Sequence, residues 1–134
     1  MRVKIFIDFW NYQLAWNEYH RAHGASGVVK IPWNPRLYEV LVSSIDKTAV
    51  YAGTHVFASF DPLSKKDLQL RKFLDYYDRA MLVAGDADHV PAVEFLGARM
   101  KQVTHAWFKG HANELRNACW NHVYFEDLMP ALTQ

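Results

Sequence analysis

Three aspartates, Asp8, Asp86 and Asp88, follow short apolar runs of the kind that form buried strands. Asp8 comes directly after the run 3–7, and Asp86 and Asp88 come just beyond a second run. Open parallel sheets bind ligands just beyond the carboxyl ends of their strands. Carboxylate oxygens are ligands that Mg²⁺ and Mn²⁺ prefer in proteins. The three acids therefore predict a site for a hard divalent cation, either magnesium or manganese.

The spacing of parallel strands explains why these acids would attract a cation. If Asp8 and Asp86 end neighbouring strands, about 4.8 Å apart, their carboxylates converge, and Asp88 reaches in from the following loop. Two like charges about 4 Å apart cost about 4 kcal/mol at an effective dielectric near 20, and a metal ion removes that repulsion. Asn11 would orient a carboxylate, hold a water or bind a phosphate. Alternatively, Asp8 and Asp88 only complement helix N-termini and Asn11 is a local cap, and the pattern alone leaves both interpretations open.

The composition indicates one domain that covers residues 1–134. With 51% hydrophobic residues the chain can form one packed core, and 134 residues are too few for two.

The sequence shows neither an apolar run of about 18 residues nor a signal-peptide pattern, so we expect no membrane segment and a cytoplasmic location. Cys119 is the only cysteine, which excludes an internal disulfide and a cysteine-based zinc cluster. Because the net charge is only +1, nucleic-acid binding would need a local basic patch.

Short apolar runs alternate with segments of helical period along the whole chain. This alternation is typical of β/α units on a mostly parallel sheet and predicts an α/β fold. The first run is apolar on both faces, so we expect a central strand. Pro91 must lie in the first turn of its helix, which places the loop 86–88 at the N-terminus of that helix. We expect strands at 2–7, 48–60, 81–84, 103–108 and 123–125, helices at 11–23, 35–47, 65–74, 87–100 and 111–118, and a partial turn from Glu126.

The chain contains KIFIDFWN at 4–11 and YDRAMLVAGDAD at 77–88, and these two segments resemble the motifs of the NYN domains, a family of PIN-like nucleases. The segment 4–11, KIFIDFWN, resembles the opening motif, in which an apolar strand ends in Asp and Asn follows three residues later. The segment 77–88, YDRAMLVAGDAD, resembles the second motif, a Tyr-Asp lead into a strand that ends in an acidic loop. The resemblance covers nearly the whole chain. It implies a Rossmann-like three-layer α/β/α sandwich with a mostly parallel central sheet, and a site that uses Mg²⁺ or Mn²⁺ to hydrolyse RNA.

The resemblance also implies roles for individual residues. Asp8, Asp86 and Asp88 match the metal-binding acids of the family, and Asn11 matches its site asparagine, so all four are the candidate catalytic residues. His89 stands where the family usually has Phe. It would donate to a phosphate or shuttle a proton, or else it packs in the first helical turn.

A middle segment of the family, with a Lys-Gly-x-Asp motif, has no match in this sequence. One hypothesis is that a family segment is missing from the sequence near Asp75, which comparison of the intact mass with 15.6 kDa would test. Asp61 is then the nearest replacement acid, although an aspartate before Pro62 is typical of a turn.

Candidate RNA contacts lie elsewhere in the chain. Lys65, Lys66, Arg71 and Lys72 would form a basic face against phosphates, with Trp10 or Tyr12 stacking on single-stranded bases. The alternative is an ordinary solvated helix face. Lys109, His111 and Arg116 form a weaker second cluster. Core or homodimer packing explains the remaining tryptophans, Trp16, Trp33, Trp107 and Trp120, better than nucleotide binding does.

Together these patterns favour a metal-dependent endoribonuclease that acts on single-stranded RNA. A catalytically weak module on the same fold, which binds nucleic acid or recruits a partner, is the alternative. The third hypothesis is a small phosphohydrolase. The sequence contains no glycine-rich phosphate loop, which disfavours the phosphohydrolase and argues against dinucleotide or ATP chemistry.

Overall fold

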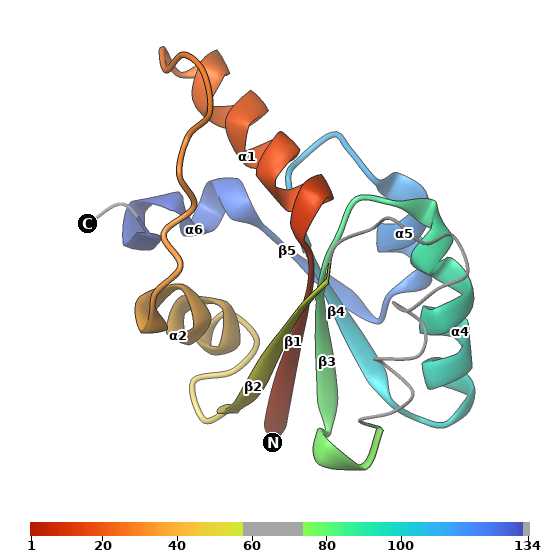
Figure 1. Ribbon diagram of the computed structural model, residues 1–134. Helices are drawn as coiled ribbons and strands as arrows, with labels where there is room; N and C mark the ends of the chain where they lie inside the picture. Colours follow the sequence, from red (N-terminus) through yellow and green to blue (C-terminus); the bar gives the residue numbers. More distant parts are fainter. Residues whose placement is uncertain (58–73, 133–134) are drawn as a thin grey trace.

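A parallel sheet forms the centre of the computed structural model, which describes residues 1–57 and 74–132 (Figure 1). Within these residues the sheet has five strands in the order β2-β1-β3-β4-β5, and all four pairings are parallel. The strands are β1 (Arg2–Asp8), β2 (Val50–Phe57), β3 (Arg79–Val83), β4 (Gln102–Trp107) and β5 (Asn121–Tyr124). The α-helices are α1 (Phe9–Ala22), α2 (Pro35–Ser43), α4 (Val90–Ala98), α5 (Asn113–Ala118) and α6 (Phe125–Leu132). Two 3₁₀ turns, η1 (Leu74–Tyr76) and η2 (Ala87–His89), lie on either side of β3 in the sequence.

Helices cover both faces of the sheet and make three layers. Figure 1 shows α1, α2 and α6 on one side of the sheet and α4 and α5 on the other. Successive side chains of β1 point to opposite faces, so Ile5 and Ile7 join the core under α1 and α2, while Phe6 joins the core under α4. The chain is therefore an α/β protein with an all-parallel sheet, which confirms the expected fold class and the central position of the first strand.

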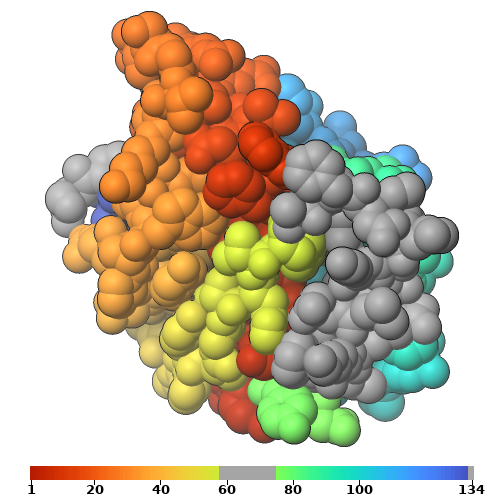
Figure 2. Space-filling model, in the orientation of Figure 1, coloured from red at the N-terminus to blue at the C-terminus, as the bar shows by residue number. Residues whose placement is uncertain are grey.

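The order of the strands reverses between β1 and β3. The chain passes from β1 to β2 on one side, and then continues with β3, β4 and β5 on the other side of β1. In a sheet of this order the switch point lies between β1 and β3, and ligands bind outside the carboxyl ends of these strands. Strand β2 is an edge strand, and Figure 2 shows its residues at the surface of the molecule.

Several elements differ from the expected ones at their ends. Residues 87–100 do not form one helix, because the 3₁₀ turn η2 precedes α4, although Pro91 does lie in the first turn of α4. The helix that begins at Pro35 ends at Ser43 rather than at residue 47. The helix expected at 65–74 falls almost entirely outside the described residues.

The end of the described chain forms a helix rather than the expected partial turn. Phe125, Met129 and Leu132 follow at helical spacing and are buried on one face of α6. That face packs beside α2, and the Arg36 Nε donates a hydrogen bond to the Ala131 carbonyl oxygen at 2.7 Å. Tertiary packing therefore outweighs Pro130, which lies inside the helix.

In the described part of the chain, no helix combines the length and the apolar character that crossing a membrane requires.

Candidate functional site

Asp8 and the loop that carries Asp86 lie at the ends of adjacent strands. Asp8 is the last residue of β1, and the pairing of β1 with β3 ends where Ile7 stands beside Val83. Asp86 follows three residues after Val83. The two strands are thus neighbours, which is the condition that the expected metal site requires, and both acids lie at the switch point of the sheet.

Asn11 joins the two strand ends. It lies in the first turn of α1, and its side-chain oxygen accepts a hydrogen bond from the Gly85 backbone N–H at 3.2 Å. The side chain therefore reaches across to the neighbouring chain segment and is not a local cap of its own helix. Because its oxygen is engaged, the amide NH₂ group remains the donor that Asn11 can offer to a ligand.

The carboxylate of Asp8 contacts a histidine. Both side chains are fully buried, and His89 Nε2 lies 3.3 Å from Asp8 Oδ2. The His89 ring also lies against Phe57, with ring centroids 6.0 Å apart. Of the two interpretations of His89, a phosphate donor or a packed residue, the structure supports the second, because His89 lies inside the molecule against one of the candidate metal acids.

The other two acids are more accessible. Asp86 is half-buried, and its Oδ1 accepts a hydrogen bond from the Asp88 backbone N–H at 2.9 Å, which caps η2. The side chain of Asp88 is exposed. Among residues 1–57 and 74–132, no three His, Cys, Asp or Glu side chains gather in an arrangement that could hold a metal ion. Oxygen donors suited to Mg²⁺ or Mn²⁺ are present at this edge, but they do not converge in this conformation.

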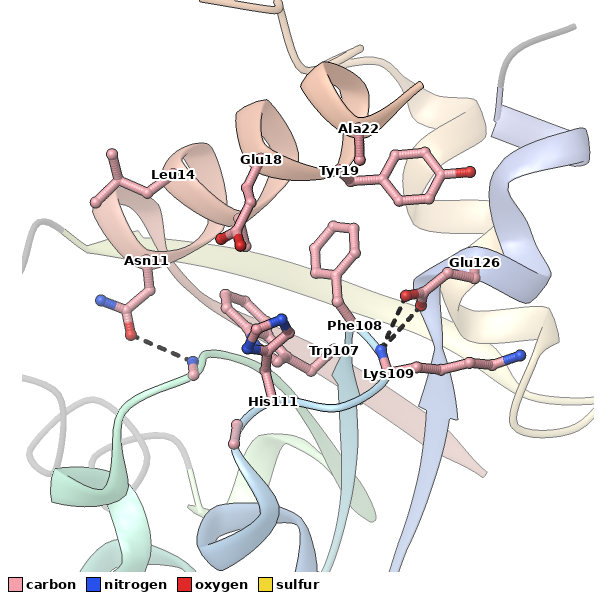
Figure 3. Close-up of a pocket in the computed structure, with 13 residues that line it drawn as sticks. Asn11, Leu14, Glu18, Tyr19, Ala22, Trp107, Phe108, Lys109, His111 and Glu126 are labelled. Carbon is pink, nitrogen blue, oxygen red and sulfur yellow. Dashed lines mark hydrogen bonds between the residues drawn. The ribbon is translucent and has the colours of Figure 1, made fainter. Parts of the chain in front are cut away.

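An open cleft of about 470 Å³ adjoins the acids. One face of α1 forms one wall, and the end of β4 with the loop after it forms the opposite wall (Figure 3). Asn11 and Gly85 line its end nearest the acids. At the other end, Glu126 from α6 accepts hydrogen bonds from the Lys109 backbone N–H at 2.9 and 3.1 Å. The cleft lies at the same edge of the sheet as Asp8, where parallel folds bind ligands.

Gly85 allows the indole of Trp107 to approach the strand end closely. A Cβ atom at Gly85 would lie 2.6 Å from Trp107 Cζ2, closer than two carbon atoms that are not covalently bonded normally come. Trp107 is buried, as the sequence suggested, yet its ring also lines the cleft. Its neighbour His105 is fully buried and donates from Nε2 to the Ala84 carbonyl oxygen at 2.7 Å.

Exposed aromatic side chains lie at the start of α1. Trp10 is 42% exposed and meets Phe9 edge to face, with centroids 5.4 Å apart. Phe9 in turn stacks on Trp33 at 6.1 Å. Tyr12, the other stacking candidate, is fully buried and belongs to the core. Of the two, only Trp10 therefore presents ring surface to the solvent.

The candidate basic residues are placed only in part. Lys65, Lys66, Arg71 and Lys72 lie outside the described residues, as does Asp61. In the second cluster, Lys109 Nζ pairs with Asp127 at 3.2 Å, and Arg116 binds the carbonyl oxygens of Phe108 and His111. These two cations are held by internal contacts.

Sequence reasoning missed the cleft and its wall on α1. Leu14, Glu18 and Ala22 follow one another at intervals of four residues after the first turn of α1 and lie on its cleft face. The spacing was visible in the sequence, but only the strand order shows that this face borders the carboxyl edge of the sheet.

Comparisons with known proteins support the fold and leave the function open. No family model and no curated protein matches the chain. A solved structure, that of a protein of unknown function from Vibrio parahaemolyticus, is similar over 95% of this chain and 94% of that chain, with a TM-score of 0.67 and 18% sequence identity. At that identity the likeness concerns the fold alone: the chain is a Rossmann-like three-layer α/β/α sandwich.

Proposed function

We propose that the protein is a metal-dependent endoribonuclease that hydrolyses single-stranded RNA at the carboxyl edge of its sheet. The observation that carries the proposal is the position of Asp8 and the Asp86 loop at the ends of adjacent strands, joined by the hydrogen bond from Gly85 to Asn11. Acids that follow adjacent strands at a switch point are suited to cation binding, because a cation would relieve the repulsion between carboxylates that turn toward one another. The resemblance of segments 4–11 and 77–88 to the NYN motifs points to the same chemistry.

Asp8, Asp86 and Asp88 are the residues that would hold Mg²⁺ or Mn²⁺. When bound, such an ion supplies the Lewis acidity and charge neutralisation that phosphodiester hydrolysis needs. The exposed Asp88 side chain is free to turn toward the strand ends, because only its backbone N–H is engaged by Asp86. Asn11 donates its NH₂ group to a phosphate oxygen, and Trp10 offers a ring on which an unpaired base stacks.

The Asp8–His89 contact favours a second candidate function. A carboxylate that is fully buried and lies 3.3 Å from a histidine nitrogen is already partly satisfied within the protein. Such an acid can serve the fold rather than a metal ion. On this reading the protein is a module that binds RNA at the same edge without cleaving it.

Cleavage of labelled single-stranded RNA in Mn²⁺, Mg²⁺ or EDTA distinguishes these functions. We expect cleavage only with a divalent ion, and a loss of at least about hundredfold in Asp86→Asn. The fold of this variant should survive, because the asparagine oxygen can still accept the Asp88 N–H and one like charge is removed. Asp75→Asn is the matched control, because Asp75 is exposed in η1, before the amino end of β3 and hence at the opposite edge of the sheet.

Each alternative has its own outcome in this experiment. An Asp86→Asn protein with full metal-dependent activity would contradict the role given to Asp86. RNA binding without cleavage under every condition would favour the binding module. Turnover of free nucleotides, with the oligonucleotide left intact, would indicate a small phosphohydrolase.

A further inference from the structure

The cleft beside Asn11 contains a carboxylate that makes no bond within the described protein. Glu18 is exposed on the cleft face of α1, and it forms neither a hydrogen bond nor an ion pair with any residue in 1–57 or 74–132. Figure 3 shows its carboxylate pointing down from α1 toward the wall that carries Trp107 and His111. The other acid of the cleft, Glu126, already accepts the Lys109 backbone N–H. Glu18 is thus the acceptor that the cleft offers to a ligand.

Several side chains that line the cleft near this carboxylate are apolar. Leu14 and Ala15 border Glu18 on α1, and Trp107 and Phe108 present ring atoms from the end of β4. Ala15 is small, and Gly85 lets the indole lie close against the loop after β3. A volume of about 470 Å³ is in the range of small-molecule sites, and a flat ring system fits between such walls.

The acceptor-only chemistry of a carboxylate restricts which flat ligand fits. Guanine presents two adjacent N–H donors, on N1 and on the exocyclic amine, which match both oxygens of one carboxylate. Adenine and cytosine offer an amino group beside a ring acceptor, and uracil places its single N–H between two carbonyl oxygens, which the carboxylate repels. His111, on the opposite wall, carries a ring nitrogen that can donate to the acceptors O6 or N7 of the same purine.

We propose that this cleft is a guanine-binding pocket in which the Glu18 carboxylate accepts hydrogen bonds from N1 and the exocyclic amine of the base. The choice of a nucleobase rests on the proposed action on RNA. Asn11 and Gly85 line both the cleft and the acid edge, so a base held beside Glu18 directs its own phosphate toward Asp8 and Asp86. Protein side chains commonly read unpaired RNA bases in this way, through the Watson–Crick edge together with apolar contact on the ring.

Calorimetric titration of the four nucleoside monophosphates in EDTA tests the pocket without any need for catalysis. We expect GMP to bind at least about tenfold more tightly than UMP, and Glu18→Gln to weaken GMP binding about tenfold. Glu18 is exposed, so its substitution should leave the thermal midpoint unchanged. Glu39→Gln, an exposed glutamate on α2 outside the cleft, is the matched control and should bind GMP as the wild type does.

The proposed guanine-binding pocket would be contradicted by equal affinity for GMP and UMP or by no binding of either. It would also be contradicted if Glu18→Gln bound GMP as tightly as the wild type does. A parallel titration with the oligoribonucleotides UUGU and UUUU identifies the source of the base. Preference for UUGU assigns the pocket to RNA, whereas preference for GMP without preference for UUGU assigns it to free nucleotides. Both titrations are done in EDTA, so they measure base binding independently of metal-dependent cleavage. A protein that binds guanine but cleaves no RNA would therefore contradict the nuclease proposal and leave the guanine-binding pocket standing.

Discussion

At the scale of single residues, His105 is an uncharged histidine inside the sheet. It is fully buried on β4 and stacks on Trp107, with ring centroids 6.5 Å apart. Burial, chiefly, together with repulsion from Arg116 and other histidines, lowers its pKa to about 4, although the hydrogen bond to the Ala84 carbonyl acts in the opposite direction. The histidine therefore stays neutral in the folded protein at pH values where an unfolded histidine is already protonated.

This difference makes stability depend on pH. The ordinary pKa of histidine is 6.5 and that of His105 in the fold is about 4, so the unfolded state binds more protons between these values. The contribution of His105 is present above pH 6.5 and is lost as the pH falls toward 4, by up to about 3 kcal/mol. We expect urea unfolding from pH 7.5 to 4.5 to show a steeper loss in the wild type than in His105→Gln, which cannot be protonated.

His105→Gln keeps a side-chain N–H that can reach the Ala84 carbonyl, so the comparison isolates protonation. His111→Gln, at an exposed histidine, is the matched control. Parallel curves for the wild type and His105→Gln would mean that His105 does not resist protonation in the fold.

At the scale of the elements, the sequence predicted strands better than helix ends. The runs in β1, β3 and β4 are apolar on both faces, as expected for strands of a parallel sheet covered on both sides, whereas the pairing of β1 with β3 was only a condition of the expected site. The sequence did not distinguish the 3₁₀ turn η2 from α4, because a 3₁₀ turn at the start of a helix has a similar residue pattern. The hydrogen bond from the Asp88 N–H to the Asp86 side chain, which caps η2, is seen only in the structure. The helix α6 was missed because Pro130 opposes it locally and only burial beside α2 favours it.

The candidate site, like the fold, could be predicted from the sequence only in part. The apolar run before each acid placed Asp8 and Asp86 just after strands of a parallel sheet, but their position at adjacent strands depends on the strand order, which the sequence pattern does not contain. The Asp8–His89 contact joins residues that are 81 positions apart in the sequence, and it depends on how η2 packs against the sheet. Periodicity carries no information on such a contact, and for the same reason it could not predict the cleft that Glu18 lines.

A second prediction concerns the close contact between Gly85, in the loop after β3, and Trp107, at the end of β4. Gly85→Ala would place Cβ 2.6 Å from the Trp107 indole, so the ring or the loop must move. We expect the free energy of unfolding in urea to fall by about 1–3 kcal/mol, because Trp107 is buried and has little room to yield. Because Gly85 and Trp107 both line the cleft, the shift would also change its shape, and we expect weaker GMP binding.

Gly97→Ala is the matched control for that experiment. Nothing lies within 4 Å of a Cβ atom at Gly97, which is in the last turn of α4. Alanine favours a helix more than glycine does, so this variant should gain up to about 1 kcal/mol. If Gly85→Ala proved as stable as Gly97→Ala, the contact with Trp107 would not be the reason for a glycine at residue 85.

At the scale of the whole molecule, one sheet supports two apolar cores. The core under α1 and α2 includes Ile5 and Leu41, and the core under α4 includes Phe6 and Leu96. Because successive residues of β1 belong to opposite cores, loss of either core removes the packing of one face of the same central strand. The two layers of helices therefore cannot unfold independently.

We accordingly expect a single cooperative unfolding transition for the chain. Trp16 and Trp107 are buried in the core under α1, so tryptophan fluorescence reports mainly on that face, whereas far-ultraviolet circular dichroism reports on the helices of both faces. The two signals should have the same urea midpoint in the wild type. Leu41→Ala and Leu96→Ala should each lower the unfolding free energy by about 2–5 kcal/mol and shift both signals together. A Leu96→Ala protein whose dichroism fell before its fluorescence changed would show that the α4 layer unfolds independently.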